Sequence, residues 1–578
     1  HWNSSGVFPV KIRFCLDKAF QLVYNCAKRK KYGETIMPDK YYESPRIVFT
    51  DKPSYWSSED SDFNIRQNLL RGVPYDIIPE MPIDGGFDCA HFNTLASEGK
   101  VNDGNFAKAY TFVDPAWNRF TGGAKRMVIF DLGHLSAVDS WSISILYEKE
   151  TGCGLPDFIS VYGSVDGKGW QKLATSRPEK PKWDTDRAVM TVDFGDRYII
   201  RYFKVEFKLE LHVYCEQFEL YGTKSLENAK EIVQVPDEAE HIAGYPTYDS
   251  IKNAHNVLLV YHCMPDVNDR NNYVTADEFK KIVGYYDKDG KLEDTFFDSF
   301  LFLPYTRFEF GEESKRFEGW KYYVDCQFRE GYNIDALNKV TGEIGKELGI
   351  ENYKSKVFFT IMYPRPEIHD FGDIDGNGNL DFARIDDMKK AVKWMIDEQM
   401  RRYREGNYAN TELGGFYWFE ESVTEANREI ICFAADYIHS KGLCLFWIPY
   451  YTAAGFADWK SYGFDIACMQ PNYVFNANSK RERLYYNAEA AKKLGLCVEL
   501  EVHWEQTPEM ITKYLEYLDV GVEEGYMNTV KMYYESGAFR SACVSDNPNW
   551  RLIYDCTYKF AKERLTSEEI KKAISDVK

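Results

Sequence analysis

The sequence predicts a multidomain protein in which a β-sandwich precedes an α/β domain, a (β/α)8 barrel. Residues 45–224 contain alternating runs rich in aromatic and β-branched residues, punctuated by Gly and Asp, which is typical of an antiparallel sandwich. From residue 255 onward, short apolar runs alternate with helical spacing, and eight such runs match the eight strands of a barrel. No glycine-rich phosphate loop follows the first of these runs, which disfavours a nucleotide-binding fold.

The chain divides into four segments. Residues 1–44 form an N-terminal extension that matches no pattern we can interpret. The sandwich, 45–224, contains strand-like runs such as 140–148, and no long amphipathic helix is evident in it. Residues 225–254 are charged and polar, which predicts a linker with one short helix, and residues 255–578 form the barrel.

The eight predicted barrel strands are short apolar runs separated by segments of helical spacing. Residues 384–406 and 507–525 are the clearest of these helices. The predicted strands are 256–262, 297–304, 356–364, 414–421, 443–451, 465–473, 496–504 and 529–537.

Composition excludes several classes of protein. Hydrophobic residues make up 44% of the 578 residues and charged residues 28%, which is typical of a folded protein rather than a disordered one. The net charge of −19 disfavours binding to nucleic acid, and no apolar run is long enough to span a membrane. The 13 cysteines are scattered without Cys-x-x-Cys pairs, which favours free buried thiols over a disulfide framework. Aromatic residues reach 16%, and flat aromatic faces suit both a large core and the binding of sugar rings.

Carboxylates gather where a barrel has its active site, at the C-terminal ends of the strands. Glu420 and Glu421 end the fourth predicted strand. Glu499, Glu501 and His503 share one face of the seventh strand because their spacing is two. Two buried carboxylates on an apolar strand cost several kcal/mol unless they are paired, so we interpret this set as catalytic, although pairing of Glu499 with a basic residue remains an alternative.

Two carboxyl groups on strands four and seven are typical of glycoside hydrolysis, which needs one proton donor and one nucleophile or base. We expect Glu420 or Glu421 to act as the general acid/base, and Glu501 or Glu499 as the nucleophile or base. Adjacent strand residues face opposite ways, so only one of Glu420 and Glu421 points into the site. Many barrel glycosidases place Asn before the acid/base, whereas this chain has Phe419 or Glu420 there.

Aromatic and amide side chains at the same strand ends are candidate contacts for sugar rings and hydroxyls. About half of the aromatic residues there are expected to be core. The candidate substrate-binding residues are Trp418, Tyr450, Tyr451, Gln470, Asn472, Tyr473, His503, Trp504 and Glu535.

The segment "DIDGNGNLD" (373–381) resembles the first half of an EF-hand calcium loop. Asp373, Asp375, Asn377 and Asp381 occupy the positions of ligands, whereas Arg384 stands where a bidentate Glu is expected. A structural Ca²⁺ and a plain Asp/Gly/Asn turn are both compatible with this pattern. We expect no organic cofactor.

Five segments of the sandwich have a characteristic order and spacing, namely "VNDGNF" (101–106), "MVIFDLG" (127–133), "LPDFISVYGSVDGKGWQKL" (155–173), "RYFKVEF" (201–207) and "CEQFELYG" (215–222). Through these segments the sandwich resembles the discoidin, or coagulation factor 5/8 type C, family over almost its whole length. The resemblance implies a jelly-roll module, often carbohydrate-binding, with a structural calcium near the "NDG" loop and the last strand. Asp103 and Glu216 are candidate ligands by this resemblance alone.

Four segments of the barrel are distinctive, namely "GGFYWFEES" (414–422), "FWIPYYTAAGFADWKSYGFDIACMQPNY" (446–473), "CVELEVHW" (497–504) and "NWRLIYDCTYKF" (549–560). Through these segments the barrel resembles an uncharacterised bacterial family, family 4855 of the domains of unknown function. The resemblance implies a secreted or surface protein of polysaccharide-using bacteria, often joined to discoidin-like modules, and it implies no activity.

Together these observations predict a carbohydrate-active protein, a glycoside hydrolase with an attached glycan-binding module. The expected partner is a polysaccharide or oligosaccharide. A non-catalytic glycan-binding protein is an alternative, and so is a polysaccharide lyase that uses Tyr450 or His503 as its base. We expect a secreted, periplasmic or cell-surface location in a bacterium, reached through an N-terminal signal that has been removed.

Overall fold

A computed structural model describes most of the chain, and the predicted extension at residues 1–44 lies outside the described residues. The chain forms two compact units, a β-domain and a barrel. The described ranges are 47–79, 101–121, 124–151, 153–209, 212–236, 242–263, 273–304, 313–476, 478–535 and 537–577.

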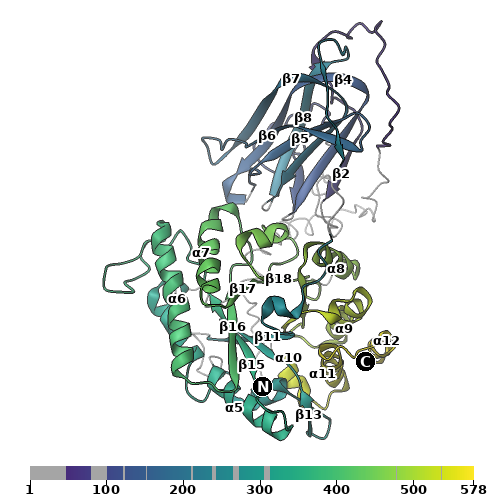
Figure 1. Ribbon diagram of the computed structural model, residues 1–578. Coiled ribbons are helices and arrows are strands. Elements are labelled where there is room, and N and C mark those ends of the chain that lie inside the picture. Colours follow the sequence, from purple (N-terminus) through teal and green to yellow (C-terminus); the bar gives the residue numbers. More distant parts are fainter. Residues whose placement is uncertain are drawn as a thin grey trace. The chain divides into compact units, whose positions relative to one another are not determined.

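The N-terminal domain is the predicted β-sandwich domain, built mainly of antiparallel strands (Figure 1). Two long strands, β4 and β7, pair with each other along most of their length, and β8 pairs with the other edge of β4. The strands are β1 (Gln67–Asn68), β2 (Tyr75–Pro79), β3 (Asn118–Thr121), β4 (Lys125–Glu148), β5 (Ile159–Ser164), β6 (Gly169–Ser176), β7 (Thr185–Lys208), β8 (His212–Thr223), β9 (Lys230–Glu231) and β10 (Val235–Pro236).

β4 is long enough to pair with different strands on the two sides of a break in its register. Its register with β7 shifts between Asp131 and Ser136, and Gly133 in this break has a φ of 80°, which glycine adopts without strain. Before the break β4 pairs with β2, and after it β4 pairs with β8. Trp141 and Phe203 lie in the apolar core that these strands enclose.

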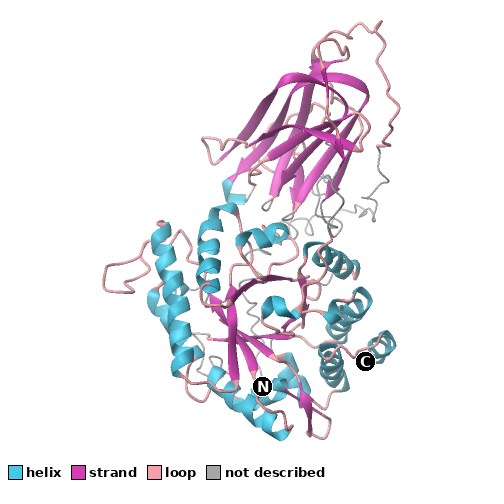
Figure 2. Cartoon of the chain, in the orientation of Figure 1, coloured by secondary structure: helices cyan, strands magenta, loops and turns pink. Residues whose placement is uncertain are grey.

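The C-terminal domain is a closed barrel of eight parallel strands, as predicted. Helices surround the strands (Figure 2). The strands are β11 (Asn256–His262), β14 (Ser299–Pro304), β15 (Ser355–Ile361), β16 (Thr411–Trp418), β17 (Cys444–Trp447), β18 (Ile466–Met469), β19 (Cys497–Glu501) and β20 (Lys531–Tyr534), and β11 pairs with β20 to close the ring. A small hairpin of β12 (Gly284–Tyr286) and β13 (Leu292–Thr295) lies between β11 and β14 in the sequence.

Both helices singled out from the sequence are present within one residue of their predicted bounds. The second, α9, begins with the Thr507 hydroxyl accepting from the Met510 N–H, has Pro508 in its first turn, and ends at Gly525 with a φ of 87°. The helices are α2 (Ala276–Val283), α4 (Phe317–Gln327), α5 (Asn333–Glu347), α6 (Ile385–Glu405), α7 (Arg428–His439), α8 (Glu482–Leu494), α9 (Pro508–Glu524), α10 (Ala538–Cys543), α11 (Pro548–Ala561) and α12 (Ser567–Asp576).

Several barrel strands end earlier than predicted, and this moves candidate residues from strands into loops. β17 stops at Trp447 and β18 at Met469, shortly before Pro449 and Pro471. Proline has no N–H to donate to a sheet ladder, so regular pairing stops near it.

The segment predicted as a linker is shared between the two domains instead. β9 pairs with β7 and β10 pairs with β6, so the β-domain extends beyond residue 224. The short helix at Tyr248–Ile251 confirms the helical part of the prediction, and Ile251 packs in the core of the barrel.

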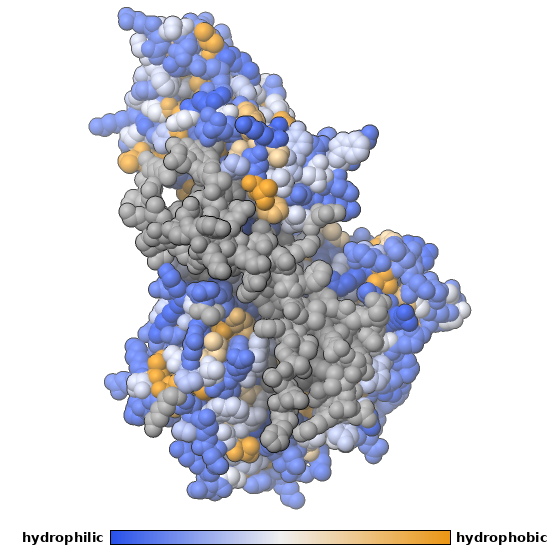
Figure 3. Space-filling view, turned by 180° about the vertical axis from the view of Figure 1, so that it is seen from behind, coloured by the Kyte–Doolittle hydropathy of each residue, from blue (hydrophilic) through white to orange (hydrophobic). Residues whose placement is uncertain are grey.

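Among the described residues, no helix is long and apolar enough to cross a membrane. Most of the described residues visible in Figure 3 are hydrophilic, and the apolar ones among them form small separate patches. The ten cysteines in the described part of the chain are all free.

Candidate active site

Alternate residues of each barrel strand face the lumen and fill its interior. Leu259 of β11, Phe358 of β15, Phe446 of β17 and Met532 of β20 belong to one buried apolar cluster, together with Cys497 of β19. Because side chains alternate along a strand, Glu499 and Glu501 continue the face of β19 that Cys497 occupies. The carboxylates therefore lie above an apolar interior, at the C-terminal ends of the strands.

Glu420 and Glu421, which follow β16, lie on opposite faces, as the alternation of side chains along an extended chain requires. Tyr417 and Phe419 belong to the lumen cluster, and Glu421 continues their face. The Gln470 side-chain amide donates to Glu421 Oε1 over 3.3 Å and to the Ile448 carbonyl over 2.8 Å. Gln470 therefore fixes the position of the Glu421 carboxylate.

Glu420 lies on the other face of this segment. Its carboxylate forms an ion pair with Arg365 Nη2 over 2.9 Å, and its carbonyl accepts from the Trp447 indole N–H. Trp418 shares this face, is fully buried, and packs against Tyr363. Trp418 is therefore a packed interior residue rather than the sugar-binding residue that the sequence predicted. Glu420 pairs with Arg365 away from the lumen.

Glu501 is almost fully buried and is held by groups from two neighbouring elements. The Tyr517 hydroxyl, on α9, donates to Glu501 Oε2 and accepts from the backbone N–H of Tyr473 over 3.0 Å. Asn472 has a left-handed φ of 51°, and its backbone also hydrogen-bonds the Glu501 carboxylate. Burial raises the pKa of Glu501 to about 8, while Tyr517, the backbone of Asn472 and the charge of Arg483 act against that rise.

Glu499 precedes Glu501 by two residues on β19 and is likewise almost fully buried. Burial raises its pKa well above the ordinary value, and the nearby charges of Glu501 and Glu421 raise it further. Its Oε1 atom is buried without a hydrogen-bond partner. Glu499 is thus close enough to Glu501 and Glu421 for their charges to act on it, and its raised pKa leaves it protonated at neutral pH.

Aromatic rings form a continuous series from these carboxylates to the surface. Tyr261 of β11 contacts Tyr534 of β20 at a ring separation of 5.7 Å, and Phe475 contacts Tyr534 at 5.5 Å. Phe475 stacks with Trp504 at 5.9 Å, and Trp504 is 38% exposed. We call these four residues, Tyr261, Tyr534, Phe475 and Trp504, the aromatic wall.

His503 stacks on Trp504 at a ring separation of 4.0 Å, beside the aromatic wall. Its Nδ1 lies 3.0 Å from the Glu505 backbone N–H and 3.3 Å from the Glu505 carbonyl, and the shorter contact favours the neutral tautomer with its proton on Nε2. Burial lowers the pKa of His503, which favours this neutral form. The ring can therefore donate one hydrogen bond from Nε2.

Tyr450 and Tyr451 lie just past β17, close to Gln470. Tyr450 forms an isolated bridge with Gln470 and its hydroxyl accepts from Ser422 over 3.2 Å. Tyr451 donates its backbone N–H to the Gln470 carbonyl, and Arg483 stacks on its ring. These half-buried residues lie beside Gln470, which binds Glu421, and remain candidates for contact with a sugar.

Two residues that were predicted to contact the substrate contact other parts of the barrel instead. Tyr473 is 3% exposed and its hydroxyl donates to Glu516 on α9 over 2.5 Å. Glu535 accepts from the Phe539 backbone N–H at the start of α10 and pairs with Arg540. Neither side chain is placed to receive a sugar.

Tyr517, Arg483, Phe475 and Tyr261 belong to the site although sequence reasoning did not select them. Tyr261 could have been found, because it precedes the end of β11 by one residue and continues the lumen face of Val257 and Leu259. The other three lie on helices or loops, where no spacing rule predicts their reach.

The calcium loop predicted at 373–381 has the geometry of a tight turn. One carboxylate oxygen of Asp373 accepts from the backbone N–H groups of Asp375, Gly376 and Asn377, at 3.1, 2.7 and 3.1 Å. Asp381 contacts His369 at 2.9 Å. Within the described ranges, no three His, Cys, Asp or Glu residues are grouped as a metal site, and calcium binding here stays a prediction.

A family model, Domain of unknown function (DUF4855), matches residues 256–559, which is more than half of the chain and nearly all of the barrel. None of the curated proteins matches the chain in sequence.

Solved structures of carbohydrate-binding proteins are similar to the N-terminal part of the chain. CpGH89CBM32-6 of Clostridium perfringens is 17% identical over 27% of this chain and 99% of its own, with a TM-score of 0.18. Chitosan-binding module 2 of a Paenibacillus sp. IK-5 chitosanase/glucanase, solved with chitotriose, is 17% identical over 27% of this chain and 100% of its own, at a TM-score of 0.18. A Ruminococcus gnavus GH29 fucosidase in complex with fucose is 14% identical over 28% of each chain, at 0.20. At these values the likeness carries no argument about function.

We expect Glu499 to make the stability of the barrel fall as pH rises. Its pKa is raised in the folded chain, so above the unfolded pKa of about 4.5 the unfolded chain loses a proton that the folded chain retains. Glu499→Gln removes this proton, and its unfolding temperature should therefore fall less between pH 5 and pH 8 than that of the unmodified chain. Scanning calorimetry at several pH values measures this, and equal slopes for the two proteins would contradict the assignment.

Proposed function

The chain belongs to the DUF4855 family, and we propose that its barrel is a glycoside hydrolase that uses Glu421 and Glu501. The observation that carries this proposal is the placement of these two carboxylates at the C-terminal end of the lumen, from β16 and β19, beside the aromatic wall. Hydrolysis of a glycosidic bond needs a proton donor and a nucleophile or base on opposite sides of the scissile bond. The N-terminal domain would hold a glycan, and the protein would act outside the bacterial cytoplasm.

Glu501 is the proposed nucleophile or base because its polar contacts favour the carboxylate. A hydroxyl and backbone groups donate to it, and Arg483 contributes positive charge. Glu421 is the proposed general acid/base. Its partner, Gln470, is a neutral amide, which positions the carboxyl group without binding it to a fixed positive charge.

Glu499 is proposed to be a protonated, neutral neighbour of Glu501. Its lack of a partner for Oε1 and its raised pKa keep it neutral at neutral pH. A neutral Glu499 reduces the repulsion that would otherwise oppose ionisation of Glu501.

The aromatic wall is the proposed sugar-binding surface. Phe475 and Trp504 are nearly parallel, with 18° between their ring planes, and Trp504 is exposed to solvent. Flat apolar faces of this kind stack on sugar rings, while the His503 Nε2–H, Tyr450 and Asn472 could bond to hydroxyls.

Glu421→Gln and Glu501→Gln should each lower the rate of glycan hydrolysis by about a thousandfold or more, since each removes a group that transfers a proton or forms the covalent bond. The matched control is Glu420→Gln, which changes the adjacent carboxylate on the other face and should retain activity. The measurement is release of reducing ends from a library of polysaccharides, with binding followed by calorimetry. Retained binding and lost turnover support the proposal.

Two outcomes would contradict hydrolysis by these residues. If the unmodified chain binds glycans but never releases reducing ends, the protein is a glycan-binding protein. If products carry a new double bond, detected by ultraviolet absorbance, the reaction is that of a lyase.

The rate should rise with pH through an inflection near 8, because Glu501 acts as a carboxylate and its pKa is raised to about 8. Tyr517→Phe removes a hydrogen bond to this carboxylate, worth about 1.5–3 kcal/mol. The inflection should therefore move up by about one to two pH units. The profile of kcat/KM against pH measures both effects.

Tyr473→Phe is the control for this shift, because the Tyr473 hydroxyl contacts Glu516 rather than Glu501. A rate that falls as pH rises through 8 would instead make Glu501 the proton donor and reverse the two roles.

A further inference from the structure

Glu216 of the β-domain is a buried carboxylate whose position is set by an irregularity in its strand. The register between β4 and β8 shifts so that Gln217 faces Ser144 and Cys215 faces Ile145, which leaves Glu216 without an opposite residue. Such a bulge turns a side chain out of the regular alternation. Glu216 is fully buried as a result, and a buried carboxylate requires a compensating partner.

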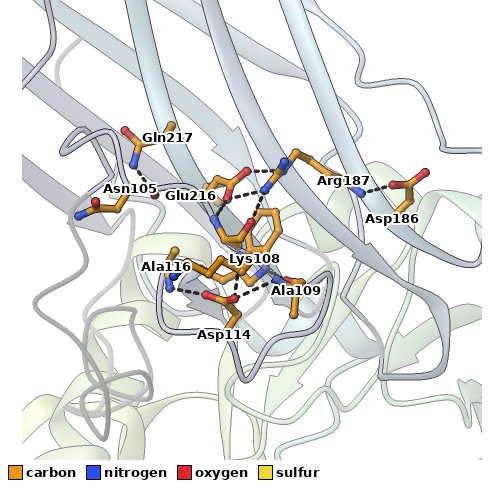
Figure 4. A network of polar contacts seen from close by, with 12 residues as sticks. Asn105, Lys108, Ala109, Asp114, Ala116, Asp186, Arg187, Glu216 and Gln217 are labelled. Atoms are coloured by element: carbon orange, nitrogen blue, oxygen red, sulfur yellow. Dashed lines mark hydrogen bonds and ion pairs between the residues drawn. The ribbon is translucent and has the colours of Figure 1, made fainter.

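That partner is Arg187, near the start of β7 (Figure 4). The Arg187 Nε group forms an ion pair with Glu216 Oε1, and Nη2 donates to Glu216 Oε2 over 3.1 Å. Nη2 also donates to the carbonyl of Ala107 over 2.7 Å, and the Ala107 backbone N–H donates to Glu216. One guanidinium therefore joins β7, β8 and the loop that contains Ala107.

Asp103, the other candidate calcium ligand, is also engaged by protein donors. Its Oδ1 accepts from the Asn105 backbone N–H at 2.8 Å and from the Gln217 side chain at 2.9 Å. Its Oδ2 accepts from the Asn105 side-chain amide at 2.8 Å. Gln217 also binds this loop through the Gly104 N–H and the Asn105 carbonyl, at 2.8 and 3.1 Å.

The surroundings of Arg187 suit a flat guanidinium better than a metal ion. Its guanidinium carbon lies 5.8 Å from the ring centre of Phe106, 5.1 Å from that of Tyr110 and 5.8 Å from that of Trp117. Rings at these distances attract a planar cation. Calcium requires six to eight oxygen ligands, whereas the carboxylates and the carbonyl here already accept from N–H groups.

We propose that the guanidinium of Arg187 is the built-in cation of this domain, in the place where the discoidin resemblance implied a calcium ion. It binds the Glu216 carboxylate and the Ala107 carbonyl, oxygen atoms that a calcium ion would otherwise use as ligands. The guanidinium thereby holds the loop of residues 103–109 against β7 and β8. The loop is therefore stable without added metal. This inference does not depend on the hydrolase proposal, because it concerns the other domain.

Limited proteolysis at Lys108 tests the inference locally. Lys108 is exposed within the loop, and trypsin cleaves after it when the loop opens. The full chain is digested in EDTA and in calcium chloride, and the peptide that ends at Lys108 is quantified by mass spectrometry. Local cleavage separates this loop from any calcium effect at residues 373–381.

The unmodified chain should be cleaved after Lys108 at the same rate in EDTA and in calcium. Arg187→Met should be cleaved about tenfold faster or more in EDTA, because it leaves Glu216 buried without its ion pair. Arg177→Met is the matched control, since Arg177 stacks on the exposed Phe158 in the same domain, and it should leave the rate at Lys108 unchanged.

Faster cleavage of the unmodified chain in EDTA than in calcium would overturn the inference, and it would do so even if Arg187→Met failed to fold. Equal rates at Lys108 for Arg187→Met and the unmodified chain, both measured in EDTA, would also overturn it.

Discussion

The lumen of a closed parallel barrel is an apolar space, and this constraint governs every polar group placed in it. Leu259, Phe358, Phe446 and Met532 fill the interior, so a charge above them is poorly solvated. Side chains alternate along β19, which places Glu499 and Glu501 on this face, and the chain continues beyond the strands into loops. Those loops bring the donors that partly compensate Glu501, while Glu499 stays neutral. The desolvation that destabilises the fold therefore also keeps a proton on Glu499, beside the two carboxylates proposed for acid–base chemistry.

The eight strands and the position of the site could be predicted because both depend on local patterns. Short apolar runs that alternate with segments of helical spacing define the strands. The spacing of Glu499, Glu501 and His503 indicates one shared face. The choice between Glu420 and Glu421 could not be made in the same way. The preceding run, "FYWF", is apolar at every position because both faces of a parallel strand are covered, so no polar residue marks the lumen side.

Residues that reach the site from helices and loops escape sequence analysis for a different reason. Tyr517 lies 16 positions after Glu501, and its reach depends on the path of the loop before α9 and on the rotation of the helix. Phase along a helix shows which side is buried but does not show which atom a buried hydroxyl meets. The same limit explains Trp418 and Glu535, whose residue types suit sugar binding but whose neighbours, Tyr363 and Arg540, place them in packing contacts.

The two domains compensate buried carboxylates by different means, and the difference fits the role proposed for each carboxylate. Glu216 is paired with a guanidinium, and its contacts join two strands and a loop. Burial raises the pKa of Glu216, and Arg187 opposes that rise through a direct ion pair, which suits a group that only has to stay in place. Glu501 receives its side-chain hydrogen bond from a neutral hydroxyl, and Glu421 from a neutral amide. Neutral donors orient a carboxyl group without adding a fixed positive charge, and such partial compensation suits the proton transfer proposed for Glu421 and Glu501.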